Sequence, residues 1–201
     1  MVNNFDLIKS LMKFDSPNDF YFVQVIQRKK DHKEENKRLG RNNNARLIKA
    51  YYVYSLEQFE EYQLEMITLA TMFNARVGIN LNRRNNERVA FEMLEQLSAC
   101  LKSRNYNLSK LYNSCCGMVT GSDKLWLVDI DEKDLAKVDE ISVFINGLMP
   151  VSEEGESKIK ALIPTRSGYH LITTAFNSKV FGEAYPKVEV HKNNPTVIYI
   201  P

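Results

Sequence analysis

Hydrophobic positions recur along the chain in strand-like and helix-like periods. Residues 20–27 are aromatic and β-branched, as in a strand, and residues 47–54 are predicted to form its hairpin partner. Ser55 is predicted to begin a helix, because Gln58 follows at the spacing of a capping box. Apolar residues then recur at intervals of three and four as far as Phe73, which gives this helix one apolar face.

The middle of the chain continues with a strand and a second helix. Residues 75–81 alternate between apolar and polar side chains, which predicts a strand, and residues 83–86 are predicted to form a turn. Residues 104–123 contain several asparagines and glycines and are predicted to be a loop. A helix is expected from about residue 87 to residue 102, and its apolar face is expected to be buried through Val89, Ala90, Met93, Leu94, Leu97 and Leu101.

Strands dominate the last third of the chain. Residues 125–131 are apolar on both faces until two acids end the run, which indicates a strand in the centre of a sheet. A helix is predicted at 134–148 and a short helical turn at 178–182. Further strands are predicted at 158–163, 168–174, 187–191 and 196–200, the last two as a hairpin. These elements predict an α+β, or mixed α/β, protein.

Two carboxylates end the predicted strand 125–131. Side chains on an extended strand alternate faces and advance ~3.3 Å per residue, so Asp129 and Asp131 point the same way with Cα atoms roughly 6.5 Å apart. Such a pair can share two divalent cations ~3.5–4 Å apart. Without a cation the two charges repel each other. The pair therefore predicts a divalent-metal site; the alternative is an ordinary strand that ends in acids.

A second motif, residues 164–173, combines a polar turn with a strand that carries His170. Arg166, Ser167 and the backbone at Gly168 form a candidate cradle for phosphate oxygens. A glycine in the turn allows a ligand to approach the chain closely. The alternative is a plain β-turn followed by a histidine that is hydrogen-bonded in the core.

A third motif contains Glu189 and His191, which share one face of the predicted strand 187–191. Glu189 completes a metal site if the fold brings it beside Asp129 and Asp131. The alternative is a solvated acid on a hairpin.

Composition is that of a globular protein, with 44% hydrophobic and 26% charged residues. No apolar run approaches the ~20 residues that a membrane helix needs. The first residues also lack the layout of a signal peptide. We therefore expect a cytoplasmic protein with no membrane partner. The adjacent Cys115 and Cys116 fit that compartment as small, partly buried side chains.

Positive charge is concentrated in residues 28–46, although the net charge of the chain is only +2. Such a basic, polar loop can bind nucleic-acid phosphates by neutralising their charge. The alternative is a solvated hairpin tip. The candidate nucleic-acid-binding residues in this segment are Arg28, Lys29, Lys30, Arg38 and Arg41.

Taken together, the three motifs resemble the archaeo-eukaryotic primase superfamily, and the closest pattern is the polymerase domain of bacterial end-joining ligases. In that superfamily two acids at a strand end precede a helix, then a segment with glycine and histidine, then a third acid on a strand that turns back. The counterparts here are residues 128–131, 166–170 and 188–197. The resemblance implies a two-lobed core, in which an N-terminal α/β lobe (1–123) packs on a metal-site lobe (124–201) with an RRM-like antiparallel sheet.

The resemblance also implies a metal-dependent nucleotidyltransferase that adds nucleotides to the 3′-hydroxyl of a nucleic acid. Asp129 and Asp131 would bridge two Mg²⁺ or Mn²⁺ ions, and Glu189 would complete the catalytic site. His170 would contact the phosphates of the nucleotide. The implied partners are nucleoside triphosphates, single-stranded or primed DNA or RNA, and a helicase or accessory replication protein.

Charge and position add further binding candidates. Arg166 and Lys192 are expected to act as phosphate clamps. Arg76, Arg83 and Arg84 are expected to line the opposite wall of the cleft and to follow a template backbone. The alternative for these three arginines is that they are solvent-facing charges on a strand and a turn.

Two other functions remain open from the sequence. One is a non-catalytic descendant of the same fold that binds nucleic acid or protein. The short chain and the position of Ser167, three residues before His170, favour it. The other is a metal-dependent phosphohydrolase or nuclease that uses the same carboxylates and releases nucleotides.

Overall fold

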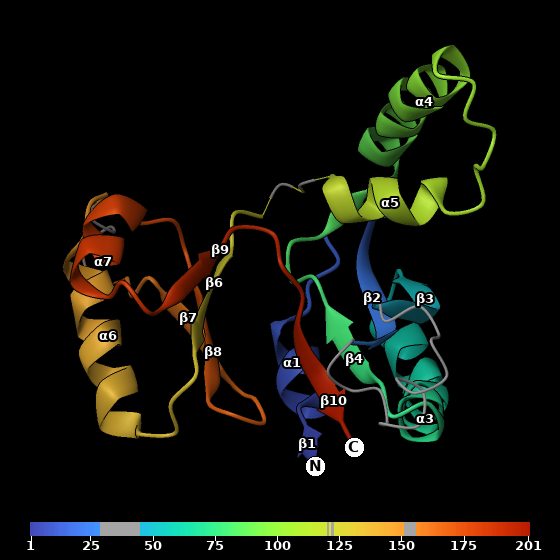
Figure 1. The fold of residues 1–201 in the computed structure, drawn as a ribbon. Helices are drawn as coiled ribbons and strands as arrows, with labels where there is room; N and C mark the ends of the chain where they lie inside the picture. The colour runs from blue at the N-terminus through green and yellow to red at the C-terminus, as the bar shows by residue number, and fades with distance from the viewer. Residues whose placement is uncertain (29–44, 120, 122, 151–155) are drawn as a thin grey trace, which may run out of the picture.

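The protein is an α+β structure with two antiparallel sheets that lie side by side (Figure 1). The computed structural model describes residues 1–28, 45–119, 121, 123–150 and 156–201. The strand order of the larger sheet is β1-β10-β4-β2-β3, and β5 pairs with β2. Its strands are β1 (Val2–Asn3), β2 (Asp19–Gln27), β3 (Arg46–Val53), β4 (Arg76–Ile79), β5 (Arg84–Asn85) and β10 (Thr196–Ile200).

The smaller sheet is built from the later part of the chain. Its strand order is β7-β8-β6-β9, from β6 (Trp126–Ile130), β7 (Ile159–Pro164), β8 (Tyr169–Thr173) and β9 (Glu189–His191). Helix α6 (Leu135–Gly147) follows β6 and helix α7 (Ser178–Ala184) follows β8. The chain therefore runs β-α-β-β-α-β with the first strand between the third and fourth, which is the split β-α-β arrangement. Both helices cover the face that lies away from the larger sheet (Figure 1).

Local sequence patterns explain most of these elements. The predicted pairing of β2 with β3 is confirmed, and so is the central position of β6 between β8 and β9. Helix α3 (Leu56–Met72) begins as expected, because the Ser55 hydroxyl accepts a hydrogen bond from the amide of Gln58 at 3.2 Å. The N-terminal helix α1 (Phe5–Leu11), which no pattern indicated, packs with α3 against the larger sheet.

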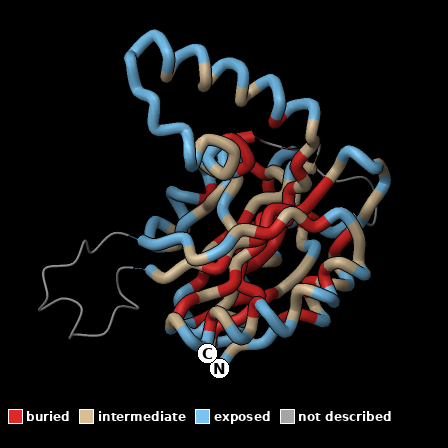
Figure 2. The backbone as a smooth tube through the Cα atoms, turned by 90° about the vertical axis from the view of Figure 1, so that its right-hand side faces the viewer, coloured by how far each residue is buried: buried red, intermediate tan, exposed pale blue. Residues whose placement is uncertain are grey.

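The region around helix α4 (Asn86–Lys102) differs from the prediction. Helix α4 forms, but only Val89 of its expected apolar face is buried, and Phe91, Leu94 and Leu101 are exposed. Figure 2 shows α4 extending from the body of the protein with most of its length exposed or half-buried. The helix therefore lacks a partner for most of its apolar residues among the described parts of the chain.

The predicted loop at 104–123 is wrong, because residues Leu111–Met118 form helix α5. This helix has no side-chain hydrogen bond at its N-terminus, so no capping signal marks it in the sequence. Cys115 and Cys116 are fully buried against Phe20 and Phe22 of β2. Burial of these side chains stabilises a helix that its own sequence favours only weakly.

The predicted hairpin of residues 187–191 with 196–200 is also wrong. Strand β9 pairs with β6, whereas β10 crosses to the larger sheet and pairs with β1 and β4. The connection is fixed by the larger sheet, because the side chain of Asn80 donates to the carbonyl of Asn193 at 2.9 Å. Residues 124–201 therefore contribute to both sheets, and β10 lies at their junction.

In the described parts of the chain, no helix is long and apolar enough to cross a membrane.

Candidate functional site

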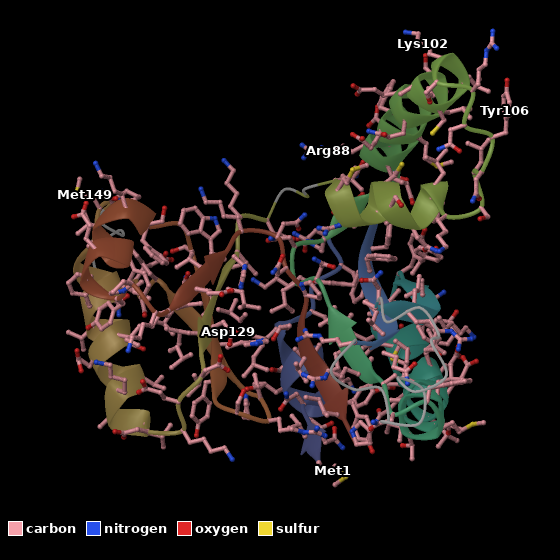
Figure 3. The ribbon with its side chains drawn as sticks, viewed as in Figure 1. Met1, Arg88, Lys102, Tyr106, Asp129 and Met149 are labelled. Atoms are coloured by element: carbon pink, nitrogen blue, oxygen red, sulfur yellow. The ribbon has the colours of Figure 1, made fainter. Side chains whose placement is uncertain are left out.

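Three predicted site residues lie in one row across the smaller sheet. The strand register places Asp129 of β6 directly opposite His170 of β8 on one side and opposite Glu189 of β9 on the other. Side chains of directly opposed residues share one face, with Cβ atoms about 4.5–5.5 Å apart. Asp129 shares its face with Leu127, which packs against the larger sheet. The row therefore faces the junction of the two sheets, where Figure 3 labels Asp129.

Asp131 lies just beyond the end of β6 and has its own partner. One of its carboxylate oxygens accepts a hydrogen bond from the Ser167 hydroxyl at 2.8 Å. The turn after β7 thus fixes the second carboxylate of the pair. Within the described ranges, no three histidine, cysteine, aspartate or glutamate side chains are grouped closely enough to hold one metal ion. The backbone places the acids as neighbours, while their carboxylates bind separate protein groups.

Negative charge accumulates around Asp129. Burial raises the pKa of Asp129, and the neighbouring charges of Asp131 and Glu189 raise it further. His191 and Arg28 act in the opposite direction but do not cancel this effect. A carboxylate whose ionised form is disfavoured by burial and by like charges favours a nearby cation.

His170 is buried next to this acid. Its Nδ1 lies 2.9 Å from the Thr196 hydroxyl on β10, and its Nε2 lies 3.6 Å from the Asp129 carboxylate. Burial lowers the pKa of His170 to about 4, and Arg28 and His191 contribute to the decrease. The imidazole is therefore neutral at pH 7 and links the two sheets through Thr196.

The turn before β8 does not offer the backbone cradle expected for phosphate. The amide of Gly168 donates to the Thr165 hydroxyl at 3.0 Å, so this donor is already used. A Cβ atom at residue 168 would lie 1.9 Å from the carbonyl oxygen of Ile130 and 2.7 Å from the amide nitrogen of Glu132. The chain itself, rather than a ligand, makes the close approach that requires glycine.

The two expected phosphate clamps contact other groups of the protein. The guanidinium of Arg166 donates to the carbonyl of Pro201 at 2.8 Å. The amine of Lys192 lies 4.8 Å from the centre of the Trp126 ring, which is at the start of β6 and packs on the face covered by α6 and α7. Lys192 is therefore directed away from the row of acids, because successive residues of β9 alternate between the faces of the sheet.

The arginines expected on the opposite wall differ from one another. Arg84 has no exposed surface, and its guanidinium donates to the carbonyls of Cys116 and Asn82 and to the Asn193 side chain at 2.6–2.9 Å. Burial lowers the pKa of Arg84 to about 10. Arg84 therefore holds the β9–β10 connection and cannot reach a template, which corrects the prediction for this residue.

Arg83 and Arg76 have different surroundings. Arg83 forms an ion pair with Asp123 at 2.8 Å and another with Asp15 at 2.7 Å, so its charge is already compensated. Arg76 is half-buried on β4, on the face opposite to the buried Val77 and Ile79. These observations do not test whether Arg83 and Arg76 contact a template, so both roles stay predictions.

The basic segment lies largely outside the described residues. Lys29, Lys30, Arg38 and Arg41 fall in that part, so the predicted phosphate contacts of these residues stay predictions. Arg28 is described and directly follows β2. Its charge acts on Asp129 and His170, which places the start of the basic segment close to the acids.

Two residues beside the row had not been assigned a role from sequence. The Nε2 atom of His191 lies 3.1 Å from the Glu189 carboxylate. The sequence indicated this contact, because residues two positions apart on a strand share one face. Thr196 contacts His170 from the other sheet. No sequence signal marked Thr196, because the predicted hairpin paired its strand with β9.

The chemistry of the donor set fits a hard divalent cation. Asp129, Asp131 and Glu189 offer only carboxylate oxygens, which Mg²⁺ and Mn²⁺ prefer. Burial and, to a smaller extent, the neighbouring acids raise the pKa of Asp129, and a cation at this position would oppose both effects. Comparison of the chain with models of known families, with curated proteins and with solved structures finds no match.

Proposed function

We propose that the protein is a metal-dependent nucleotidyltransferase of the primase-polymerase type, acting on nucleoside triphosphates and primed or single-stranded nucleic acid. The supporting observation is the row of Glu189, Asp129 and His170 across three adjacent strands. Asp131 follows Asp129 by two residues, just after the end of β6. The order of the motifs in the chain and the split β-α-β sheet agree with the RRM-like lobe of the superfamily that the sequence resembles. The accessory replication partner follows from this resemblance alone, whereas the cytoplasmic location is proposed from the composition of the chain.

In this proposal Asp129, Asp131 and Glu189 hold Mg²⁺ or Mn²⁺. Divalent ions there would stabilise negative charge on the attacking and leaving oxygens of an in-line displacement. The protein supplies the position and the protonation state of the surrounding groups. Ser167 fixes Asp131 through its hydroxyl, so the second acid has one orientation.

His170 has the role of a neutral hydrogen-bond donor in this proposal. When the Thr196 hydroxyl donates to Nδ1, the imidazole proton is on Nε2, the nitrogen that faces Asp129. A neutral N–H at this place can donate to a phosphate oxygen without repelling a nearby cation. The charge of Arg28 acts on both Asp129 and His170, and in this proposal it would attract the template or the triphosphate.

Primer extension tests the proposal. A labelled primer on a template is incubated with nucleoside triphosphates and Mn²⁺, and extended and shortened products are separated. Asp129→Asn combined with Asp131→Asn should reduce extension by about a thousandfold, because several kcal/mol of charge stabilisation are lost at 1.36 kcal/mol per tenfold in rate.

The matched control combines Asp139→Asn with Glu183→Gln, which neutralises two exposed acids on α6 and α7. It should extend primers like the unsubstituted protein. Extension that survives the Asp129 and Asp131 changes would refute the proposal. Metal-dependent shortening of the primer instead would assign the acids to a nuclease.

One observation favours a second candidate, a non-catalytic nucleic-acid-binding module. In the described residues no three potential ligands are grouped for one ion, and Asp131 is bound to Ser167. This candidate predicts salt-dependent binding of single strands without any metal-dependent change in them. Strand binding by filter assay together with an inactive extension assay would select it.

A further inference from the structure

A cavity of about 670 Å³ lies at the start of β6, at the other end of the strand from the acids. Its walls come from the end of α1 and the segment after it, from β2, from the loop after β4, from the segment just before β6, and from β7 and β8 with their flanking residues. Both sheets therefore contribute to it. The volume is within the range of about 300–1,000 Å³ that is usual for sites of small organic ligands.

The cavity is separate from the row of acids. Leu125 and Ile172 line it, whereas Asp129, Asp131 and Glu189 do not. Asp129 follows Leu125 by four positions along the chain, a span of about 13 Å on an extended strand. Between the two places Leu127 packs in the hydrophobic core.

Among the described residues of the cavity wall, positive charge exceeds negative charge. The cations are Lys13, Arg83, Lys124, Lys158 and Lys160, and the described carboxylates that line the cavity are those of Asp123 and Glu156. Asp123 binds Arg83, and Glu156 lies 4.0 Å from Lys160. After these pairings the remaining wall carries an excess of lysine charge, which favours an anion.

Lys158 gives an independent indication of the same preference. Its side chain is almost fully buried, with 1% of the residue exposed, and its amine donates to the carbonyl of Asn146 at 2.8 Å. Asn146 is in the last turn of α6, where the helix dipole stabilises a cation in part, but its carbonyl carries no formal negative charge. A bound anion in the adjacent cavity would compensate the charge.

The rest of the wall is apolar and partly aromatic. Leu11, Leu81, Leu125 and Ile172 supply hydrocarbon surface, and the ring of the buried Tyr21 lies among them. A ligand that fits both the lysine-rich part and the apolar part of the wall carries a phosphate and a flat, weakly polar ring. We propose that the cavity is a second ligand site, which binds a nucleoside phosphate without a divalent cation. The proposal does not depend on whether the acids catalyse.

Calorimetric titration in the presence of EDTA tests this site, with ATP, AMP and inorganic triphosphate as probes. Lys124→Ala combined with Lys160→Ala removes two exposed cavity lysines and should weaken ATP binding by about tenfold or more, because charge-assisted hydrogen bonds are lost. The control, Lys179→Ala with Lys187→Ala, removes the same charge from exposed positions elsewhere and should bind ATP normally.

Two further comparisons complete the test. Asp129→Asn with Asp131→Asn should leave binding in EDTA unchanged, which separates this site from the acids. Inorganic triphosphate should bind more weakly than ATP, since it lacks the ring. The proposal is overturned if ATP does not bind at millimolar concentration, if both lysine pairs weaken binding equally, if the acid variant alone abolishes binding, or if inorganic triphosphate binds as tightly as ATP.

Discussion

The two ends of β6 face the same junction between the sheets but differ in how their charges are compensated. At the end of the strand, Asp129, Asp131 and Glu189 accumulate negative charge, and the pKa of Asp129 is raised. Before its start, Asp123 binds Arg83 through both carboxylate oxygens, at 2.8 Å and 2.9 Å. Ion pairing of this kind is typical of structural contacts, whereas uncompensated, perturbed acids are typical of functional sites. The comparison therefore indicates a structural role for the Arg83–Asp123 pair and agrees with the role proposed above for the acids.

The largest effect is expected from Gly168→Ala, at the acidic end. The added Cβ would overlap the backbone of Ile130 and Glu132, which cannot move without displacing the end of β6. The free energy of unfolding, measured by urea titration, should fall by about 3 kcal/mol or more.

Gly182→Ala on α7 is the control for this change, because nothing lies within 4 Å of its added Cβ. It should change stability by less than about 1 kcal/mol, and in the stabilising direction, since alanine favours a helix. Equal stability of the two variants would contradict the close approach of the turn to β6.

A smaller loss is expected from Asp123→Asn, before the start of the strand. The amide cannot maintain charged hydrogen bonds to Arg83, so stability at pH 7 should fall by about 2 kcal/mol. Burial alone would raise the pKa of Asp123, but the hydrogen bonds and charge of Arg83 outweigh it and hold this pKa below its usual value.

Asp123 therefore stabilises the folded protein fully at pH values above its unfolded pKa of about 3.9. This stabilisation is lost as the pH falls through the lower pKa that Asp123 has in the folded protein. Unfolding curves of the two proteins should differ at pH 7 and converge only as the pH falls below the lowered folded pKa of Asp123. A difference that stays constant over this range would contradict the ion-pair explanation.

The smallest effect, of opposite sign, is expected from Asp129→Asn. This change removes a carboxylate that burial, Asp131 and Glu189 all disfavour in its ionised form. In metal-free buffer at pH 7 the variant should be more stable by up to about 1 kcal/mol. Asp139→Asn, at an exposed position on α6, should stay within about 0.5 kcal/mol of the unsubstituted protein. If Asp129→Asn is destabilising, the two ends of β6 do not differ as described.

Elements with a strong local pattern could be predicted from the sequence. The apolar run of β6, the alternation of β4 and the cap at Ser55 each depend on a pattern of only a few neighbouring residues. Helix α5 and the path of β10 could not be predicted in this way. Both depend on contacts between distant residues, such as Cys116 with Phe22 and Asn193 with Asn80.

The same distinction holds for the two sites. Asp129 and Asp131 are neighbours in the chain, so their pairing was visible, and the expectation that Glu189 lies beside Asp129 is confirmed by the register of β9. The functional roles of these residues stay predictions. The cavity draws its lysines from separate segments, and no stretch of sequence indicates that they meet.

Anomalous diffraction from crystals soaked in Mn²⁺ and a nucleoside triphosphate tests the central claim most directly. The proposal predicts Mn²⁺ peaks within ligand distance of Asp129, Asp131 and Glu189, with the triphosphate adjacent to His170. Saturating Mn²⁺ that leaves these carboxylates without a peak, or that binds only elsewhere, would contradict the proposal.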